Sequence, residues 1–142
     1  MVSRAARRAA SVDTTRARGL VNAARTAAAL AVAAILWQGA TAGQLLERNR
    51  TFLRLHEVGA IATHVLTGLA ALTVFLLWRT ARDRLWPVVA AVVVFAASFV
   101  QAALGDDETM WAHVPGALLL MLGSTAVLVW TLLPRRPARG NP

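Results

Sequence analysis

Four long apolar stretches, separated by short polar connections, restrict the chain to one kind of fold. Each stretch has the ~20 residues that an α-helix needs to cross the hydrocarbon core of a bilayer. Transmembrane strands would show a two-residue alternation of side chains, which these stretches lack. Because the connections are short, consecutive helices should pack as antiparallel neighbours. The sequence therefore predicts an all-α fold, an integral membrane four-helix bundle. Its predicted helices cover about residues 26–46, 56–78, 85–105 and 109–133.

Composition agrees with a membrane protein of one domain. Hydrophobic residues make up 57% of the chain and charged residues only 15%, where a soluble domain has about a quarter charged. There is no cysteine, which excludes disulfides, thiolate metal sites and cysteine nucleophiles. The net charge of +8 does not indicate nucleic acid, because basic residues collect on the cytoplasmic side of membrane proteins.

The positions of the arginines predict the orientation. Tails at residues 1–25 and 134–142, together with the connection between the second and third helices, carry 12 of the 15 arginines. The other side carries Arg48, Arg50 and Arg54 and the acidic run of residues 106–108. The positive-inside rule then places both termini in the cytoplasm of a multi-pass protein of the inner (plasma) membrane. The basic N-terminal tail is expected to touch anionic headgroups.

Two histidines occupy matching positions in a short internal repeat. The second predicted helix begins with His56-Glu57-Val58-Gly59-Ala60, and the fourth contains His113-Val114-Pro115-Gly116-Ala117, so both read His-x-x-Gly-Ala. A small hydroxyl residue follows each histidine after eleven positions. The preceding helix in each case carries a glutamine, Gln38 or Gln101, near its outer end. This pattern indicates a bundle built from two repeated helical hairpins, related by an axis along the membrane normal.

Two histidines that face each other from opposite helices can hold one haem by both axial positions. The sequence therefore predicts haem b between the second and fourth helices, with His56 and His113 as iron ligands. The outer arginines Arg48, Arg50 and Arg54 could pair with the haem propionates. With both axial positions filled, electron transfer or haem handling is favoured over catalysis. The alternatives are a cofactor-free accessory or structural subunit with interfacial histidines, or a small transporter.

Other polar residues near the histidines allow further interpretations. A zinc or copper site would use His56, Glu57, His113 and a carboxylate of residues 106–108. Glu57 could instead orient the His56 ring, or be an ordinary acidic residue at a helix N-terminus. His64 lies about two turns deeper than His56. It could form a second haem site with Met121, the residue at the matching position of the repeat, or hydrogen-bond to Gln38 or Gln101 on another helix.

Two motifs carry a resemblance to known proteins. Leu55-His56-Glu57 opens the second helix, and Phe99-Val100-Gln101-x-x-Leu104-Gly105 precedes the acidic connection. With these motifs the chain resembles small uncharacterised four-helix membrane proteins of actinobacteria, and one half of haem A synthase. In that enzyme each four-helix half carries a histidine on its second and fourth helices, and His56 and His113 match them. The chain has one such bundle, so the resemblance implies monooxygenase-like chemistry only for a homodimer.

The expected partners follow from this interpretation. They are the lipid bilayer, a redox protein or a quinone, and a second copy of the chain, with no nucleic acid. Gly39 and Gly43 form a Gly-x-x-x-Gly motif that predicts close helix packing.

Overall fold

The computed structural model describes residues 4–81, 84–106 and 108–134, with side chains from Thr14 onward. Within these ranges the chain is helical and contains no strand. In order, the elements are α1 (Arg4–Leu46), the short 3-10 helix η1 (Arg50–Phe52), α2 (Leu53–Ala81), α3 (Trp86–Ala103) and α4 (Met110–Leu132). The predicted all-α fold is confirmed for the described part of the chain.

Each of the four α-helices has a segment long and apolar enough to cross a membrane. These segments are Thr14–Leu46, Arg50–Thr80, Trp86–Ala103 and Met110–Leu132, and they contain or overlap the four predicted stretches. The protein is thus a multi-pass membrane bundle. The basic N-terminal region continues as helix from Arg4, without a break at residue 25. Most of the C-terminal tail, from residue 135, lies outside the described residues.

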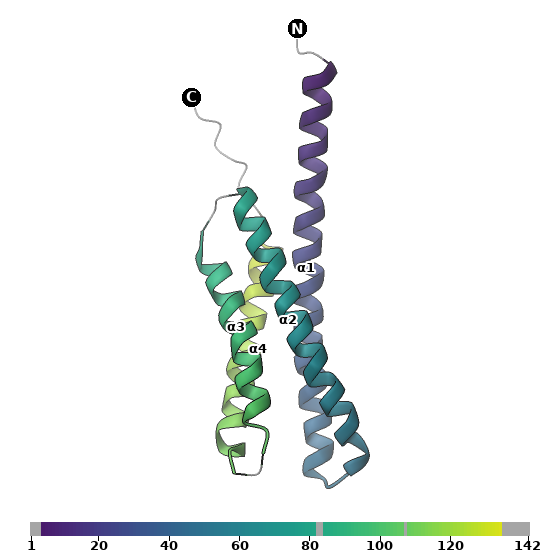
Figure 1. Cartoon of the computed structure of the whole chain (residues 1–142), viewed down its shortest axis with the longest axis vertical. Helices are drawn as coiled ribbons and strands as arrows, with labels where there is room; N and C mark the ends of the chain where they lie inside the picture. Colours follow the sequence, from purple (N-terminus) through teal and green to yellow (C-terminus); the bar gives the residue numbers. More distant parts are fainter. Residues whose placement is uncertain (1–3, 82–83, 107, 135–142) are drawn as a thin grey trace.

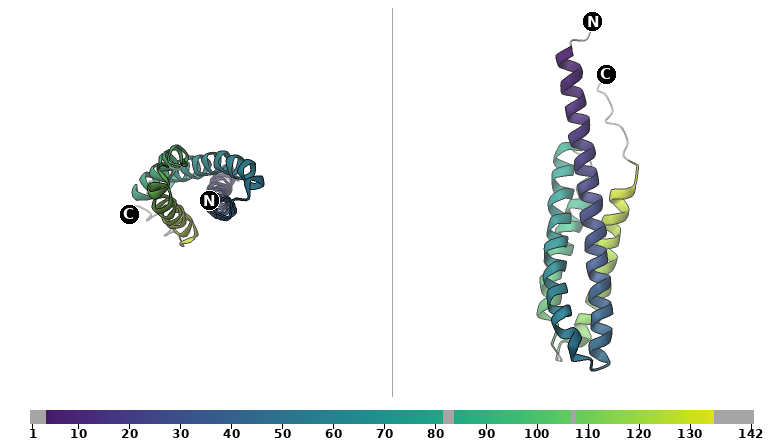
Figure 2. Two further views of the ribbon diagram at one scale, coloured as in Figure 1. Left: turned by 90° about the horizontal axis from the view of Figure 1, so that it is seen from below. Right: turned by 90° about the vertical axis from the view of Figure 1, so that its right-hand side faces the viewer.

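The helices pack in a ring in which each contacts its two neighbours. α1 packs against α2 and α4, and α3 packs against the same two helices, so α2 and α4 stand diagonally opposite. α1 begins and α4 ends at the same end of the bundle, and the N-terminal part of α1 projects well beyond the other helices there (Figure 1). At the other end the α1–α2 and α3–α4 hairpins diverge (Figure 1), while the side view of Figure 2 shows all four helices running roughly along one axis.

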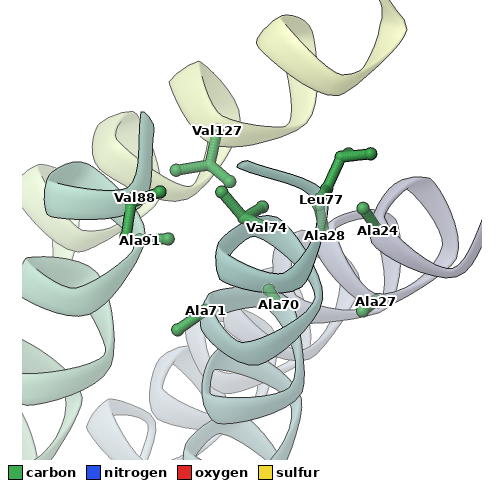
Figure 3. Packing of buried hydrophobic residues seen from close by; sticks show 10 residues of the cluster. All are labelled: Ala24, Ala27, Ala28, Ala70, Ala71, Val74, Leu77, Val88, Ala91 and Val127. Atoms are coloured by element: carbon green, nitrogen blue, oxygen red, sulfur yellow. The ribbon is translucent and has the colours of Figure 1, made fainter. Parts of the chain in front are cut away.

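Small side chains form the centre of the bundle. A cluster of alanines and valines, with Leu77, is contributed by all four helices and is buried in the bundle (Figure 3). Because alanine is short, the helices approach one another closely, as is typical of bundles in lipid. Buried positions on α3 repeat the spacing of those on α1, and those on α4 repeat the spacing on α2. The pairs are Ala24 and Pro87, Ala28 and Ala91, Ala31 and Val94, Ile35 and Ser98, Thr63 and Leu120, Thr67 and Ser124, Ala70 and Val127, and Val74 and Thr131.

An arginine ties α1 to the C-terminal end of α4. The Arg25 Nε–H donates a hydrogen bond of 2.9 Å to the backbone carbonyl of Thr131. That carbonyl belongs to the last turn of α4, where carbonyl groups lack partners within the helix and carry partial negative charge. The contact therefore satisfies an otherwise unpaired acceptor and fixes where α1 and α4 meet.

The glycines of the bundle differ in the space around them. Gly39 and Gly43 have nothing within 4 Å of where a Cβ would lie, so the Gly-x-x-x-Gly motif faces away from the other helices, and its predicted packing role inside the bundle is wrong. At Gly123 on α4, by contrast, an added Cβ would lie 2.7 Å from the Val94 side chain of α3. Gly123 therefore lets α3 and α4 approach closely at the level of Val94.

We expect Gly123→Ala to destabilise the bundle by about 1–3 kcal/mol, the usual cost of overpacking a filled core. The reason is that buried Val94 has little room to move away from the new methyl group. Thermal unfolding in detergent, followed by circular dichroism, measures the change. Gly39→Ala is the matched control and should lose no stability, because its methyl group meets nothing. Equal unfolding temperatures for the two variants would contradict the packing described here.

Candidate functional site

A cavity of about 290 Å³ lies between the two hairpins, at the end where they diverge. Residues of all four helices line it, and its polar lining includes the three histidines of the chain and two glutamines: His56, His64, His113, Gln38 and Gln101. His56 belongs to α2 and His113 to α4, so the two histidines reach this cavity from diagonally opposite helices. The cavity is therefore where the sequence-predicted histidine pair meets.

His56 is held by α1. Its Nδ1 atom lies 2.8 Å from the Thr41 hydroxyl oxygen. The Thr41 hydroxyl donates its own hydrogen to backbone carbonyls of Trp37 and Gln38, so it accepts the hydrogen bond from His56 Nδ1–H. These contacts fix the tautomer that carries its proton on Nδ1 and leaves a lone pair on Nε2.

His113 is held in the same way by α3. Its Nδ1 atom lies 2.9 Å from the backbone carbonyl oxygen of Gln101, which can only accept, so Nδ1 carries the proton. In the described part of the chain, Nε2 of neither His56 nor His113 has a hydrogen-bond partner. A histidine that ligates a metal almost always donates its other ring N–H in this manner, which orients the ring and raises its basicity. Both rings are thus held by the kind of hydrogen bond that also orients metal-ligating histidines.

The two glutamines pack over the glycines that follow the histidines. An added Cβ at Gly59 would collide with the Gln38 side-chain oxygen, and one at Gly116 would collide with the Gln101 side-chain amide. The side-chain oxygens of both glutamines are buried and have no partner among the described residues. Buried polar atoms without a partner are rare in proteins. Two of them at matching positions beside the histidines indicate that this region is built for something other than close packing.

His64 lies deeper in the same cavity. Its Nδ1 atom lies 2.8 Å from the Ser98 hydroxyl oxygen on α3, and its ring stacks on Phe99 at 4.3 Å, with planes 4° apart. The predicted contact to another helix is therefore present, but its partner is Ser98 and not Gln38 or Gln101. α2 and α3 run antiparallel. A residue that lies later in α2, such as His64, therefore meets a residue that lies earlier in α3 than Gln101, and this residue is Ser98.

The other predicted site residues lie around the mouth or outside the cavity. Glu57 lines the cavity, but its carboxylate pairs with Arg54 at 3.6 Å in a largely exposed contact. The group that orients the His56 ring is the Thr41 hydroxyl. Arg48, Arg50 and Arg54 are all exposed near the outer ends of α1 and α2, and the described cavity lining includes none of them. Met121 packs with the cluster of Ile35, Val94 and Leu120 instead of facing His64 in the cavity.

The described residues do not bring together the alternative metal site. Among the described residues, no group of three or more histidine, cysteine, aspartate or glutamate side chains could hold a metal ion. The Asp106 carboxylate accepts hydrogen bonds from the hydroxyl and the backbone N–H of Thr109, which hold the pKa of that carboxyl below its ordinary value. Asp107 lies outside the described residues.

Sequence reasoning missed the groups that hold the histidines. Thr41 and Ser98 are ordinary helix residues in the sequence, and the acceptor for His113 is a backbone carbonyl, which no motif can reveal. The available signal was the pairing of one glutamine with each His-x-x-Gly, since each glutamine lies against that glycine.

The fold and the cavity define a class of protein, a multi-pass four-helix membrane bundle with an internal histidine-lined cavity. Comparison with protein-family models, curated proteins and solved structures found no match for the chain.

Proposed function

We propose that this protein binds haem b between α2 and α4 and serves electron transfer or haem handling. One observation carries the proposal. His56 and His113 approach a single cavity from diagonal helices, each with Nδ1–H donated to protein and Nε2 unpaired. Two neutral imidazoles with free Nε2 atoms are a standard axial ligand pair for haem iron.

The surroundings of the histidines support a ligand of this kind. A cavity of about 290 Å³ is close to the lower limit for small-molecule sites, ~300 Å³. The glutamine side chains that fill the space over Gly59 and Gly116 are flexible at their far ends, so they can turn aside as a ligand enters. The unpartnered amide oxygens of Gln38 and Gln101 lose no hydrogen bond in doing so. Bound haem would supply the redox chemistry, and the protein would fix its ligands and exclude water.

The arginines near the outer end support one orientation of the bound group. Arg48 and Arg50 are exposed in the α1–α2 connection, and Arg54 begins α2 beside Glu57. Guanidinium groups match carboxylates in geometry and charge. The propionates of a haem held at the level of His56 would therefore point toward this end. An electron would be exchanged with a redox protein or a quinone.

We also propose that the two hairpins are copies of one unit. The matched burial along α1 and α3 and along α2 and α4 supports this interpretation, as do the matched glutamine–glycine contacts. A resemblance to one half of haem A synthase, and to small actinobacterial four-helix proteins, remains part of the same proposal. Monooxygenase chemistry would require two bundles, so it would apply only to a homodimer.

The proposed location is the plasma membrane with both termini in the cytoplasm, as the arginine distribution favours. The chain lacks cysteine, so single cysteines can report the orientation without background. We expect Glu108→Cys, in the exposed α3–α4 connection, to react in intact cells with a membrane-impermeant maleimide. Arg84→Cys, in the α2–α3 connection, should react only after the cells are opened. The reverse pattern of labelling would reject this orientation.

The haem proposal is tested with the full chain, expressed with ample haem and purified in detergent. A reduced-minus-oxidised absorption spectrum should show a Soret band and a sharp α-band, as expected for six-coordinate low-spin iron. A folded but colourless protein would reject haem binding and would favour a cofactor-free accessory subunit.

A further inference from the structure

The matched pattern of the two hairpins breaks at one place in the cavity wall. His64 and Ser98 form a polar pair between α2 and α3. The residues at the matching positions, Met121 on α4 and Ile35 on α1, belong instead to one apolar cluster. His64 and Met121 each follow their hairpin's first histidine by eight residues. A polar, titratable side chain at this depth in a membrane is costly and usually marks a function.

The hydrogen bonds of this pair determine what His64 can bind. The Ser98 hydroxyl donates its hydrogen to the Phe95 carbonyl at 2.7 Å, so it must accept from His64 Nδ1–H. Nε2 of His64 therefore presents a lone pair, and it has no partner in the described part of the chain. His64 lines the cavity, so this acceptor would suit a ligand that brings a hydrogen-bond donor.

The position of the ring indicates the chemical class of that ligand. His64 stacks face to face on Phe99, whose side chain is 50% exposed on the outer surface of α3, where the bundle meets lipid. The polar pair therefore lies where α2 and α3 meet, next to the lipid-facing surface. A ligand that reaches it from the bilayer must be lipophilic, and a flat aromatic ring would fit against an aromatic wall. A lipophilic aromatic ring with hydroxyl donors is a quinol.

We propose that the contact between α2 and α3 binds the reduced form of a membrane quinone, with a quinol hydroxyl donating to His64 Nε2. The oxidised quinone carries only acceptor oxygens and would face the His64 lone pair without a hydrogen bond, so the site prefers the quinol. The inference rests on the proposed function in taking a membrane quinone as the redox partner, and it concerns binding of the quinol alone. The hydrogen bond itself requires no iron.

The test measures binding of a decyl-substituted benzoquinol and the matching benzoquinone to the full chain in lipid nanodiscs, by titration calorimetry. We expect the wild type to bind the quinol at least tenfold more tightly than the quinone. His64→Phe keeps a ring for stacking on Phe99 but has no acceptor, so the preference should disappear. Ser98→Ala leaves Nδ1 without its acceptor, so the ring can carry its proton on Nε2, and the preference should fall or reverse. Met121→Leu is the matched control on α4 and should keep the preference.

Two results would overturn the inference: equal affinity of the wild type for quinol and quinone, or an unchanged preference in His64→Phe. Each titration is made on haem-free and haem-loaded protein, so the two proposals can fail separately. A quinol preference in a protein that never shows a Soret band would reject haem binding and keep the quinol site. A normal haem spectrum without a quinol preference would reject the quinol site and keep haem binding.

Discussion

Replacing His113 by alanine should abolish the low-spin haem spectrum of the purified protein or convert it to a high-spin one. In the proposed haem site, His113 is the histidine that α4 contributes to the cavity lining, so its removal would leave the iron with His56 as its one histidine ligand. We expect a broadened, shifted Soret band, loss of the sharp α-band, and at least a tenfold lower haem content per protein. Absorption spectra and the pyridine haemochrome assay measure these changes.

His56→Ala should give the same result from the other face, because the two rings are held alike. Met121→Leu is the control, since Met121 lies outside the cavity lining and should keep the wild-type spectrum. Added imidazole should restore the low-spin spectrum of either alanine variant, which would show that the defect is a missing ligand and not misfolding. A wild-type spectrum in both alanine variants would reject these residues as axial ligands.

Thr41→Val should weaken haem binding by about 10–100-fold, the usual effect of losing a group that orients a metal-ligating histidine. Valine keeps the shape of threonine but cannot accept the hydrogen bond from His56 Nδ1–H, so the ring is free to turn or to change tautomer. Thr41 is almost fully buried, which leaves no water to replace the hydroxyl. Competition for haem with a reference haem protein measures the affinity.

Thr41→Ser keeps the hydroxyl and is the matched variant, expected to stay close to wild type in haem affinity. The midpoint potential gives a second readout, because loss of the hydrogen bond lowers the basicity of the imidazole and should raise the potential. If the valine variant matches the serine variant in both measurements, Thr41 does not position His56.

The fold was predictable because apolar length is a strong signal in a chain that spans a membrane. The helix ends were less predictable. The start predicted near residue 26 followed the loss of hydropathy, but α1 begins at Arg4. Alanine and arginine are both good helix formers, so the helix continues through a charged segment that the bilayer cannot contain.

Of the site residues, the sequence could predict those that belong to the repeated His-x-x-Gly-Ala motif. The repeat identified His56 and His113, and the structure brings both to one cavity. The groups that accept their hydrogen bonds are the Thr41 hydroxyl and the Gln101 carbonyl. Which residues of α1 and α3 lie beside the histidines depends on how the helices pack, and the local sequence does not reveal this packing. The same holds for His64, whose partner Ser98 is set by the antiparallel packing of α2 and α3.

The contact between Arg25 and the Thr131 carbonyl divides α1 into two arms of similar length. One arm forms a wall of the cavity end, and the other projects past the bundle at the end where α1 begins and α4 ends (Figure 1). At 1.5 Å per residue, α1 is a rod of roughly 65 Å. Because the Arg25 contact lies between the two arms, a tilt of the cavity arm about this point would move the N-terminal arm in the opposite direction.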